Sequence, residues 1–472
     1  MVKQSQVRPG TSLAVLSVAS FMAGLDLFIV NVAFDDIGRD FAGTSLADLS
    51  WVLNGYAIVF AALLVPLGRL ADRYGRKAGL VLGLTVFTLA SQACALAPSL
   101  WWLVAFRVVQ AAGAAALIPT SLGLLLSVFP PGRRAGAVRI WSSASALAAA
   151  AGPAVGGVLV DSSWRWVFEV NVPIGLLATA LALRFVPDSR DGASARVPDL
   201  PGAAVLTGAI ALLALGLVKI NDWPGQRTAI VVGTSVIALA FFWGRSRRHP
   251  APVIEPALLS VRTFAWSNAA VLLFTVAFAA ELLLGVLWMQ QVWHYSPVRT
   301  GLGVAPGPLM VPVMALIAGK MAARRVPVGL ITAVGCMLCA FGVVMVAASL
   351  DATPAYASEM LPGWLVGGVG VGLALPTILS AAADLPDHRF ATGSAVVNMS
   401  RQIGSVLGVS LAVAVLGSPH GYVDAHRAYV HAWLMVGAFM VVAAAAALGM
   451  TPRRHRPVTP VPETEKEVVA GT

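Results

Sequence analysis

The sequence predicts an all-α membrane protein of two six-helix bundles with an additional helix pair between them. Of its 472 residues, 58% are hydrophobic and only 11% are charged, and the mean hydropathy is +0.81. The apolar residues form about fourteen long runs, and a helix needs about 20 such residues to cross a hydrocarbon core of about 30 Å. A soluble core of this size could not bury so much apolar surface, so we expect about fourteen membrane crossings.

Short polar segments separate these runs and indicate how the chain is oriented. The expected helices cover residues 12–34, 50–67, 79–97, 101–125, 138–160, 165–183, 202–219, 228–244, 265–289, 300–318, 327–349, 361–383, 392–417 and 429–449. Most of the 32 Lys and Arg residues fall on one side if both termini are cytoplasmic. The Ala-, Val- and Arg-rich composition suggests a bacterium, so we expect a multi-pass protein of the bacterial plasma membrane with cytoplasmic termini.

A weak internal repeat supports the division into bundles. Residues 319–325 look like a degraded copy of residues 68–74, with Ala323 in the place of Asp72. Aligning the two matches the first six helices with the last six and leaves the seventh and eighth as an insertion. The expected parts are an N-terminal bundle, linkers with the inserted pair, a C-terminal bundle and a disordered cytoplasmic tail, at residues 12–186, 187–263, 264–450 and 451–472.

Residues 68–77, with the sequence GRLADRYGRK, are expected to form a tight loop between the second and third helices. Gly68 and Gly75 would let the chain turn, and the cations mark a cytoplasmic face. Asp72 could pair with Arg73, Arg76 or a helix N-terminus and so act as a latch. The alternative is a solvated basic turn that only sets the topology.

Two ionisable residues in the N-terminal half lie inside apolar runs. Asp26 is about 12 Å from the outer end of the first helix, and Arg107 is about 9 Å from the outer end of the fourth. Arg107 and Gln110 share one helix face. Because burial disfavours a charged carboxylate and a neighbouring arginine favours it, Asp26 and Arg107 are candidates for proton coupling. A static pair that ties two helices together is the alternative.

Glu281 is the corresponding acid of the second half, at a depth similar to that of Asp26. No equally deep basic residue is evident nearby, so it is a candidate for binding a proton or attracting a cationic substrate. A neutral, locally hydrogen-bonded glutamic acid is the alternative. Glu169, near the outer end of the sixth helix, is a weaker candidate because it could simply pair with Arg165.

The fifth helix contains Gly152, Pro153, Gly156 and Gly157. Gly152 and Gly156 form a small-residue face for close helix contact, and Pro153 can bend the helix. Alone, this run could be an ordinary packing device. Further polar residues in or directly beside the expected spans are candidates for lining a central cavity, namely Asn31, Gln110, Gln290, Asn398 and Arg401.

Residues 68–77 resemble the loop between helices 2 and 3 of the major facilitator superfamily. The fifth-helix run, residues 164–175, residues 290–292 and residues 401–404 extend the likeness to the fourteen-spanner drug:proton antiporter branch. This resemblance implies proton-driven export of hydrophobic, often cationic, toxic compounds by alternating access. It associates the fifth-helix run with exporters, residues 68–77 with stabilisation of one state, and Asp26 and Arg107 with proton coupling.

The sequence departs from the usual pattern around the expected cavity. Phe28, Phe34, Asp35, Ala111 and Glu169 replace residues that are common in the branch. Because these changes fall around the expected cavity, they affect the inferred identity of the substrate more than the inferred transport cycle. An importer or a lipid flippase of the same fold, or a sensor without transport activity, remains an alternative.

Other function classes lack support in the sequence. It has no nucleotide-binding GxxxxGK[ST] loop and no HExxH zinc motif, so we expect neither an enzyme nor an ATP-driven pump. The cations are spread over short clusters, which argues against nucleic acid. We expect no cofactor and no metal, with a small-molecule substrate, protons and membrane lipid as partners of a monomer. Cys94, Cys336 and Cys339 lie in apolar runs and are expected to be ordinary buried residues.

Overall fold

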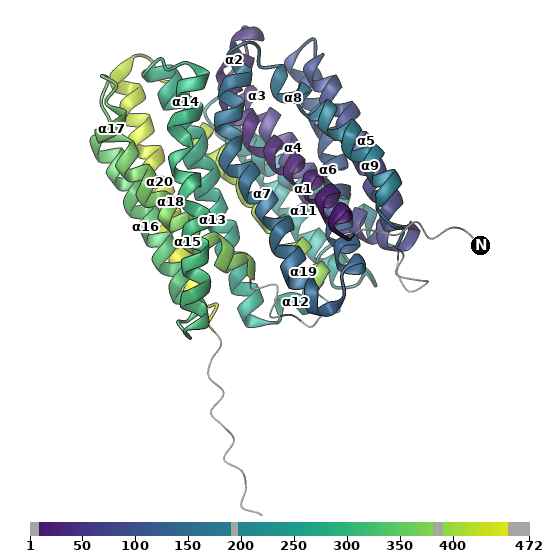
Figure 1. Ribbon diagram of the computed structural model, residues 1–472. Coiled ribbons are helices and arrows are strands. Elements are labelled where there is room, and N and C mark those ends of the chain that lie inside the picture. Colours follow the sequence, from purple (N-terminus) through teal and green to yellow (C-terminus); the bar gives the residue numbers. More distant parts are fainter. Residues whose placement is uncertain (1–8, 190–196, 381–384, 386–389, 452–472) are drawn as a thin grey trace, which may run out of the picture.

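The computed structural model describes residues 9–189, 197–380, 385 and 390–451, and every regular element in these ranges is a helix (Figure 1). Fourteen stretches within the described residues are long and apolar enough to cross a membrane. The fold class and the number of crossings are therefore confirmed. Most of the tail that the sequence predicts to be disordered, from residue 452 onward, lies outside the described residues.

Six crossings from the first part of the chain pack together. They are α1 (Pro9–Val32), α4 (Trp51–Tyr74), α5 (Arg76–Ala95), α6 (Leu100–Val128), α7 (Pro131–Val160), and α8 (Trp166–Glu169) followed by α9 (Asn171–Phe185). Leu16, Leu84 and Phe87 are fully buried in their shared apolar core. Helices that pack on one another in this way bury apolar side chains that a single helix would leave exposed.

Six further crossings pack together in the last part of the chain. They are α13 (Arg262–Leu287) with the π-helical turn η2 (Trp288–Val292), α14 (Pro297–Val304) followed by α15 (Pro306–Ala323), α16 (Val328–Ser349), α18 (Leu361–Leu379), α19 (Phe390–Leu416) and α20 (Tyr422–Leu448). Pro306 has no backbone N–H to donate within the helix, which accounts for the break between α14 and α15. Below, these two groups are called the N-terminal and C-terminal bundles.

The remaining two crossings, α10 (Leu200–Val218) and α11 (Gly225–Ser246), form the pair between the bundles in the sequence. α10 contacts α4 of one bundle and α19 of the other, whereas α11 packs on α10 and is largely exposed. Arg245 at the end of α11 forms an ion pair of 2.8 Å with Asp199, which caps the first turn of α10. The pair therefore covers the seam between the bundles along α4 and α19.

The molecule has two distinct ends. The end that carries residues 68–77, the turn before α7 and the short helix α12 (Pro256–Leu259) is called the basic end here. The opposite end carries α2 (Phe34–Asp40), α3 (Leu46–Leu49), α8, α14 and α17 (Tyr356–Glu359) (Figure 1). α14 lies against α7 at the opposite end, and the following helix α15 diverges from α7 toward the basic end (Figure 1). The bundles therefore meet more closely at the opposite end.

Residues 68–77 differ from the expected loop. α4 continues to Tyr74 and α5 begins at Arg76, so only Gly75 separates them. Gly75 has φ = 128°, a value that side chains with a Cβ rarely adopt, so it makes the whole turn. Gly68 lies within α4, where a Cβ would come within 3.0 Å of Pro119 on α6. Its small size serves helix packing, and the expectation that Gly68 forms part of the turn is wrong.

Candidate functional site

The deepest charged contact of the N-terminal bundle joins Asp26 on α1 to Arg107 on α6. Nη1 of Arg107 lies 2.5 Å from Oδ2 of Asp26, and the exposed fractions of the two side chains are 1% and 0%. The depth match expected from the sequence is therefore realised as a direct ion pair. Because an isolated buried charge is energetically very costly, each of these two buried charges is stabilised by the other.

Gln110 completes the surroundings of this pair. Its Nε2 donates to Oδ1 of Asp26 at 2.8 Å and to Oγ of Ser91 at 2.7 Å, and its Oε1 accepts from Arg107 at 2.7 Å. Asn171 also donates to Asp26, at 3.4 Å. The network thus ties α1 to α5, α6 and α9. Gln110, expected to line a cavity, instead lies inside the bundle.

Arg107 also contacts α4. Its Nε donates to the carbonyl oxygen of Val52 at 3.2 Å, and its guanidinium carbon lies 4.1 Å from the ring centre of Tyr56. Cation–π contact of this kind stabilises a desolvated guanidinium. Tyr56, Ser91 and Asn171 were not among the site residues predicted from the sequence. One feature of the sequence could have identified them: they are polar side chains inside or beside apolar runs, on helices that a six-helix bundle brings together.

Glu281 on α13 is 8% exposed and has no hydrogen bond or ion pair with a described residue. It faces α18, where a Cβ added to Gly367 would lie 3.6 Å from its Oε1. Cys339 on α16 donates to the carbonyl oxygen of the same Gly367 at 3.4 Å. The acid is therefore enclosed within the C-terminal bundle rather than exposed to the space between the bundles.

A cavity of about 100 Å³ lies between the two bundles. Its apolar wall includes Phe28 and Phe278, whose rings meet edge to face at 6.5 Å. Its polar lining comes from α1, α4, α6, α13 and α19, and consists of Asn31, Asn54, Tyr56, Arg107, Thr275, Arg401, Gln402 and Ser405. Asp26 is behind Arg107 and Glu281 is absent from the lining, so the only predicted coupling residue that reaches this cavity is Arg107.

The predicted cavity residues separate into two groups. Asn31 and Arg401 line the cavity. Asn398 instead donates to the Ser394 carbonyl of its own helix, at 3.0 Å. Gln290 in η2 donates to the Val32 carbonyl oxygen at 2.9 Å and so bridges the two bundles. Neither Asn398 nor Gln290 is among the residues around this cavity, and their predicted part in lining a cavity stays a prediction.

The fifth-helix run contacts both bundles. A Cβ added to Gly152 would meet Phe28 at 2.7 Å, and one added to Gly156 would meet Ile29 at 3.0 Å, so this face packs on α1. Gly157 faces the other way, toward the Pro297 carbonyl oxygen of α14, and the Pro153 carbonyl oxygen lies against Gly301. Glycines thus allow the backbones of α7 and α14 to approach closely at the opposite end of the molecule.

Polar contacts reinforce this closure at the opposite end. Asn54 on α4 donates to Ser410 on α19 at 3.1 Å, and Gln291 donates to Asp35 at 3.2 Å. The inserted pair takes part through Lys219, which lies 2.9 Å from Asp48. These contacts and the glycine interface hold the bundles together on this side of the cavity.

At the basic end, residues 68–77 contact the second half of the chain through Arg69, which was not among the predicted site residues. Arg69 forms an ion pair of 2.6 Å with Glu255, just before α12, and donates to the Pro252 carbonyl oxygen at 2.9 Å. Asp72 pairs with Arg76 at 2.6 Å across the Gly75 turn. Arg69 thus contacts the second half of the chain, and Asp72 braces the Gly75 turn.

Glu169 does not pair with Arg165. Arg165 instead forms an ion pair of 2.8 Å with Asp40, which also accepts a hydrogen bond of 2.9 Å from the Trp164 indole. The Trp164 and Arg165 hydrogen bonds lower the pKa of Asp40. Glu169 is half-buried at the end of α8, and its predicted part in proton coupling stays a prediction.

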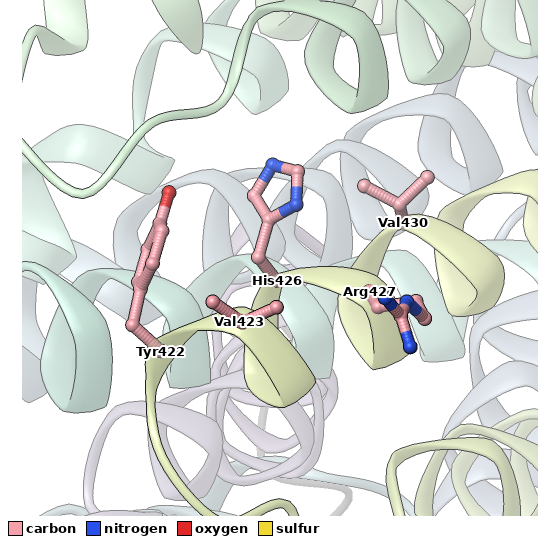
Figure 2. Close-up of a pocket in the computed structure, with 5 residues that line it drawn as sticks. All are labelled: Tyr422, Val423, His426, Arg427 and Val430. Carbon is pink, nitrogen blue, oxygen red and sulfur yellow. The ribbon is translucent and has the colours of Figure 1, made fainter.

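A second hollow, of about 280 Å³, lies at the start of α20 and is lined by Tyr422, Val423, His426, Arg427 and Val430 (Figure 2). All five side chains come from one helix, so it is a surface feature rather than an enclosed site. His426 and Tyr422 contact the segment after α16, through the Leu350 carbonyl oxygen at 3.1 Å and Asp351 at 3.2 Å. Within the described residues, no group of three or more His, Cys, Asp or Glu could hold a metal ion.

The described cysteines form no disulfide. Cys94, Cys336 and Cys339 are all buried and free. Cys94 lies beside the charged network, with its Sγ 3.9 Å from Oε1 of Gln110. In this position the thiol acts as a small apolar residue that packs against the network.

Solved structures share this fold at low sequence identity. A POT family transporter in complex with 5-aminolevulinic acid superimposes with a TM-score of 0.68 at 14% identity, over 93% of this chain and 96% of that one. A bacterial homologue of the human lysosomal transporter Spinster, in an inward-facing conformation, gives 0.64 at 16% identity, over 96% of this chain and 100% of that one. At such identities the likeness concerns the fold alone.

Sequence comparison identifies the family. The methylenomycin A resistance protein of Streptomyces coelicolor is 33% identical over 87% of this chain and 86% of its own length. The cephamycin export protein CmcT of Amycolatopsis lactamdurans is also 33% identical, over 92% and 91%. Residues 16–409 match the model of the Major Facilitator Superfamily. The chain therefore belongs to the Major Facilitator Superfamily and is a membrane transporter rather than an enzyme.

Proposed function

We propose that this protein exports hydrophobic or amphipathic small molecules, such as antibiotics, by alternating access driven by a proton gradient. The observation that carries the proposal is the polar and aromatic cavity between two bundles, one wall of which is Arg107 with Asp26 directly behind it. Relatives named for methylenomycin A resistance and cephamycin export support the direction and the class of cargo.

In the proposed cycle, the buried ion pair is the proton switch. Asp26 has no direct access to the cavity, so a proton reaches it only when Arg107 and Gln110 move. Protonation of Asp26 would release Arg107 and weaken the network that joins α1 to α5, α6 and α9. Because Gly152 and Gly156 pack α7 on α1, such a change would be passed to the contact between α7 and α14.

Glu281 is the second proposed proton site. It is enclosed by α13 and α18 without a cationic partner among the described residues, and a carboxylic acid in such surroundings is favoured in its neutral form. Glu169 is proposed only as an accessory acid near the opposite end. No cofactor is proposed, because the proton gradient supplies the energy.

We place the basic end in the cytoplasm of a bacterial plasma membrane, with the protein acting as a monomer in contact with lipid. The positive-inside rule supports this orientation. In this orientation the opposite end faces the exterior, and its close contacts close the protein on that side.

The test uses a bacterium without its own efflux pumps. Expression of the protein should raise tolerance to members of a panel of acidic, neutral and cationic antibiotics. In everted vesicles energised to an acidic interior, adding an effective compound should cause an alkaline shift reported by a pH-sensitive dye. Asp26→Asn and Glu281→Gln should each reduce both signals at least tenfold, whereas the exposed Asp424→Asn should leave them unchanged.

The possible results separate export from coupling. Tolerance that survives both acid substitutions would contradict the proton sites and leave export standing. Accumulation of the compound in place of extrusion would favour an importer, and saturable binding without flux would favour a sensor.

A further inference from the structure

The cavity contains a cation that no part of the described protein neutralises. Arg401 on α19 lines it, yet its guanidinium has no hydrogen bond, ion pair or ring contact with a described residue. At about 1.5 Å per residue it lies about 16 Å from the start of α19 and about 22 Å from its end, which is near the middle of the membrane. An unpaired charge at this depth is costly and marks a functional site by default.

Other polar atoms of the same cavity also lack partners. The hydroxyl of Tyr56, the Oδ1 of Asn54 and the Nε2 of Gln402 are buried without a hydrogen bond, in side chains that are 1%, 1% and 3% exposed. Buried polar atoms in native proteins are nearly always paired, so each such atom requires an explanation. Together with the five N–H groups of Arg401, the cavity offers mostly unused donors.

The charge balance of the lining is positive. Arg107 is neutralised by Asp26, whereas Arg401 is not, and no Asp or Glu is among the described residues that line the cavity. The enclosed acid of the facing helix, Glu281, is directed toward Gly367 of α18 instead. A cationic group bound here would meet Arg401 without a balancing carboxylate, whereas an anionic group would meet its missing counter-charge.

We propose that Arg401 forms an anion subsite in the central cavity, and that the preferred cargo is an amphipathic molecule with a carboxylate or a similar acidic group. This inference rests on the proposed export function for its physiological meaning. Arg401 would receive two acid oxygens in the paired geometry that guanidinium groups favour, with the Gln402 amide as a further donor. The apolar part of the cargo would lie against Phe28 and Phe278. The preference is opposite to the cationic cargo that the family resemblance implies.

The test compares three probes that share one ring system and differ in charge: 1-naphthylacetate, 1-naphthylacetamide and 1-naphthylmethylammonium. The full-length protein is placed in nanodiscs of phosphatidylcholine, which has no net charge, and bound probe is measured by equilibrium dialysis with subtraction of empty nanodiscs. The wild type should bind the acetate at least tenfold more tightly than the amide, and the ammonium most weakly. Arg401→Gln should remove the preference for the acetate and leave amide binding unchanged.

Two further variants keep the test decisive. Arg401→Lys retains the charge without the forked geometry and should keep a reduced preference for the acetate. Arg262→Gln changes an exposed arginine at the start of α13 and should behave as the wild type. Equal binding of acetate and amide by the wild type, tighter binding of the ammonium, no saturable binding of any probe, or an unchanged preference in a folded Arg401→Gln would each overturn the proposal. Since no flux is measured, these results are independent of whether export itself is demonstrated.

Discussion

Gly157 of α7 lies so close to Pro297 of α14 that an added Cβ would be 2.5 Å from the proline carbonyl oxygen. A methyl group does not fit at that distance, so the two backbones would have to separate. Gly157→Ala should therefore shift the protein toward a state that is open at the opposite end, and transport should fall several-fold. Spin labels at Ser162 and His294 should report a longer distance in this variant.

Gly136 provides a control for that experiment on the same helix. Nothing lies within 4 Å of a Cβ added to it, so Gly136→Ala should change neither the distance nor transport. A Gly157→Ala protein with wild-type distances and activity would show that the close approach has no part in the closure.

The buried pair of Asp26 and Arg107 predicts a strongly non-additive effect on stability. Arg107→Ala leaves an uncompensated carboxylate and should destabilise the protein by about 3 to 5 kcal/mol, the usual cost of breaking such a pair. Adding Asp26→Asn to that variant removes the orphaned charge and should restore part of the loss. Thermal unfolding in detergent measures both, and a double variant that is less stable than Arg107→Ala would contradict this account.

The ion pair of Arg69 and Glu255 predicts recovery by charge exchange. Arg69→Glu and Glu255→Arg each place like charges together at the basic end and should slow transport. The double variant restores opposite charges and should recover most of the rate. Flux in proteoliposomes measures the effect, and stability should change by less than about 1 kcal/mol because the pair is partly exposed. Equal activity in all four proteins would remove the pair from the cycle.

The contact of Asp40 with Trp164 and Arg165 predicts a pH effect at the opposite end. These two hydrogen bonds lower the pKa of Asp40, so its stabilising effect is present above the ordinary aspartate value of about 4 and is lost as the pH falls through the lower native value. Asp40→Asn should therefore be slightly less stable than wild type at pH 7, and the difference should shrink below pH 4. Unfolding midpoints across this range test it, and a difference that grows on acidification would refute it.

The sequence was sufficient for the features that depend on hydropathy and on position along a helix. The fourteen crossings follow from the apolar runs, and the depth of Asp26 and Arg107 followed from a fixed rise per residue. Rotation about the helix axis was harder to predict. Gln110 lies on the same helix face as Arg107, but its side chain faces the Asp26 network instead of the cavity, whereas Gln290, at the end of its crossing, bridges the bundles. Which side of a helix faces the cavity depends on packing between segments distant in the sequence.

Contacts between distant segments and backbone conformation, which local spacing does not reveal, also explain why residues 68–77 and Arg165 differ from the expectations. A single glycine with positive φ can reverse the chain, so the charged residues on both sides of Gly75 remain helical and the expected loop disappears. Arg165 has an acid four residues away in Glu169, but the tertiary fold brings Asp40 closer. Local spacing identified the possible partners of these side chains, and the tertiary structure selected among them.

The position of α10 has a consequence for how the two bundles can separate. Because this helix touches α4 and α19 at once, the seam along those helices is bound on its outer face, while no helix of the described part of the chain covers the seam between α7 and α15 in this way. The two bundles should therefore rotate relative to each other about an axis that lies along α10. The widest gap at the basic end would then form between α7 and α15, and a cargo dissolved in the surrounding lipid would enter from that flank.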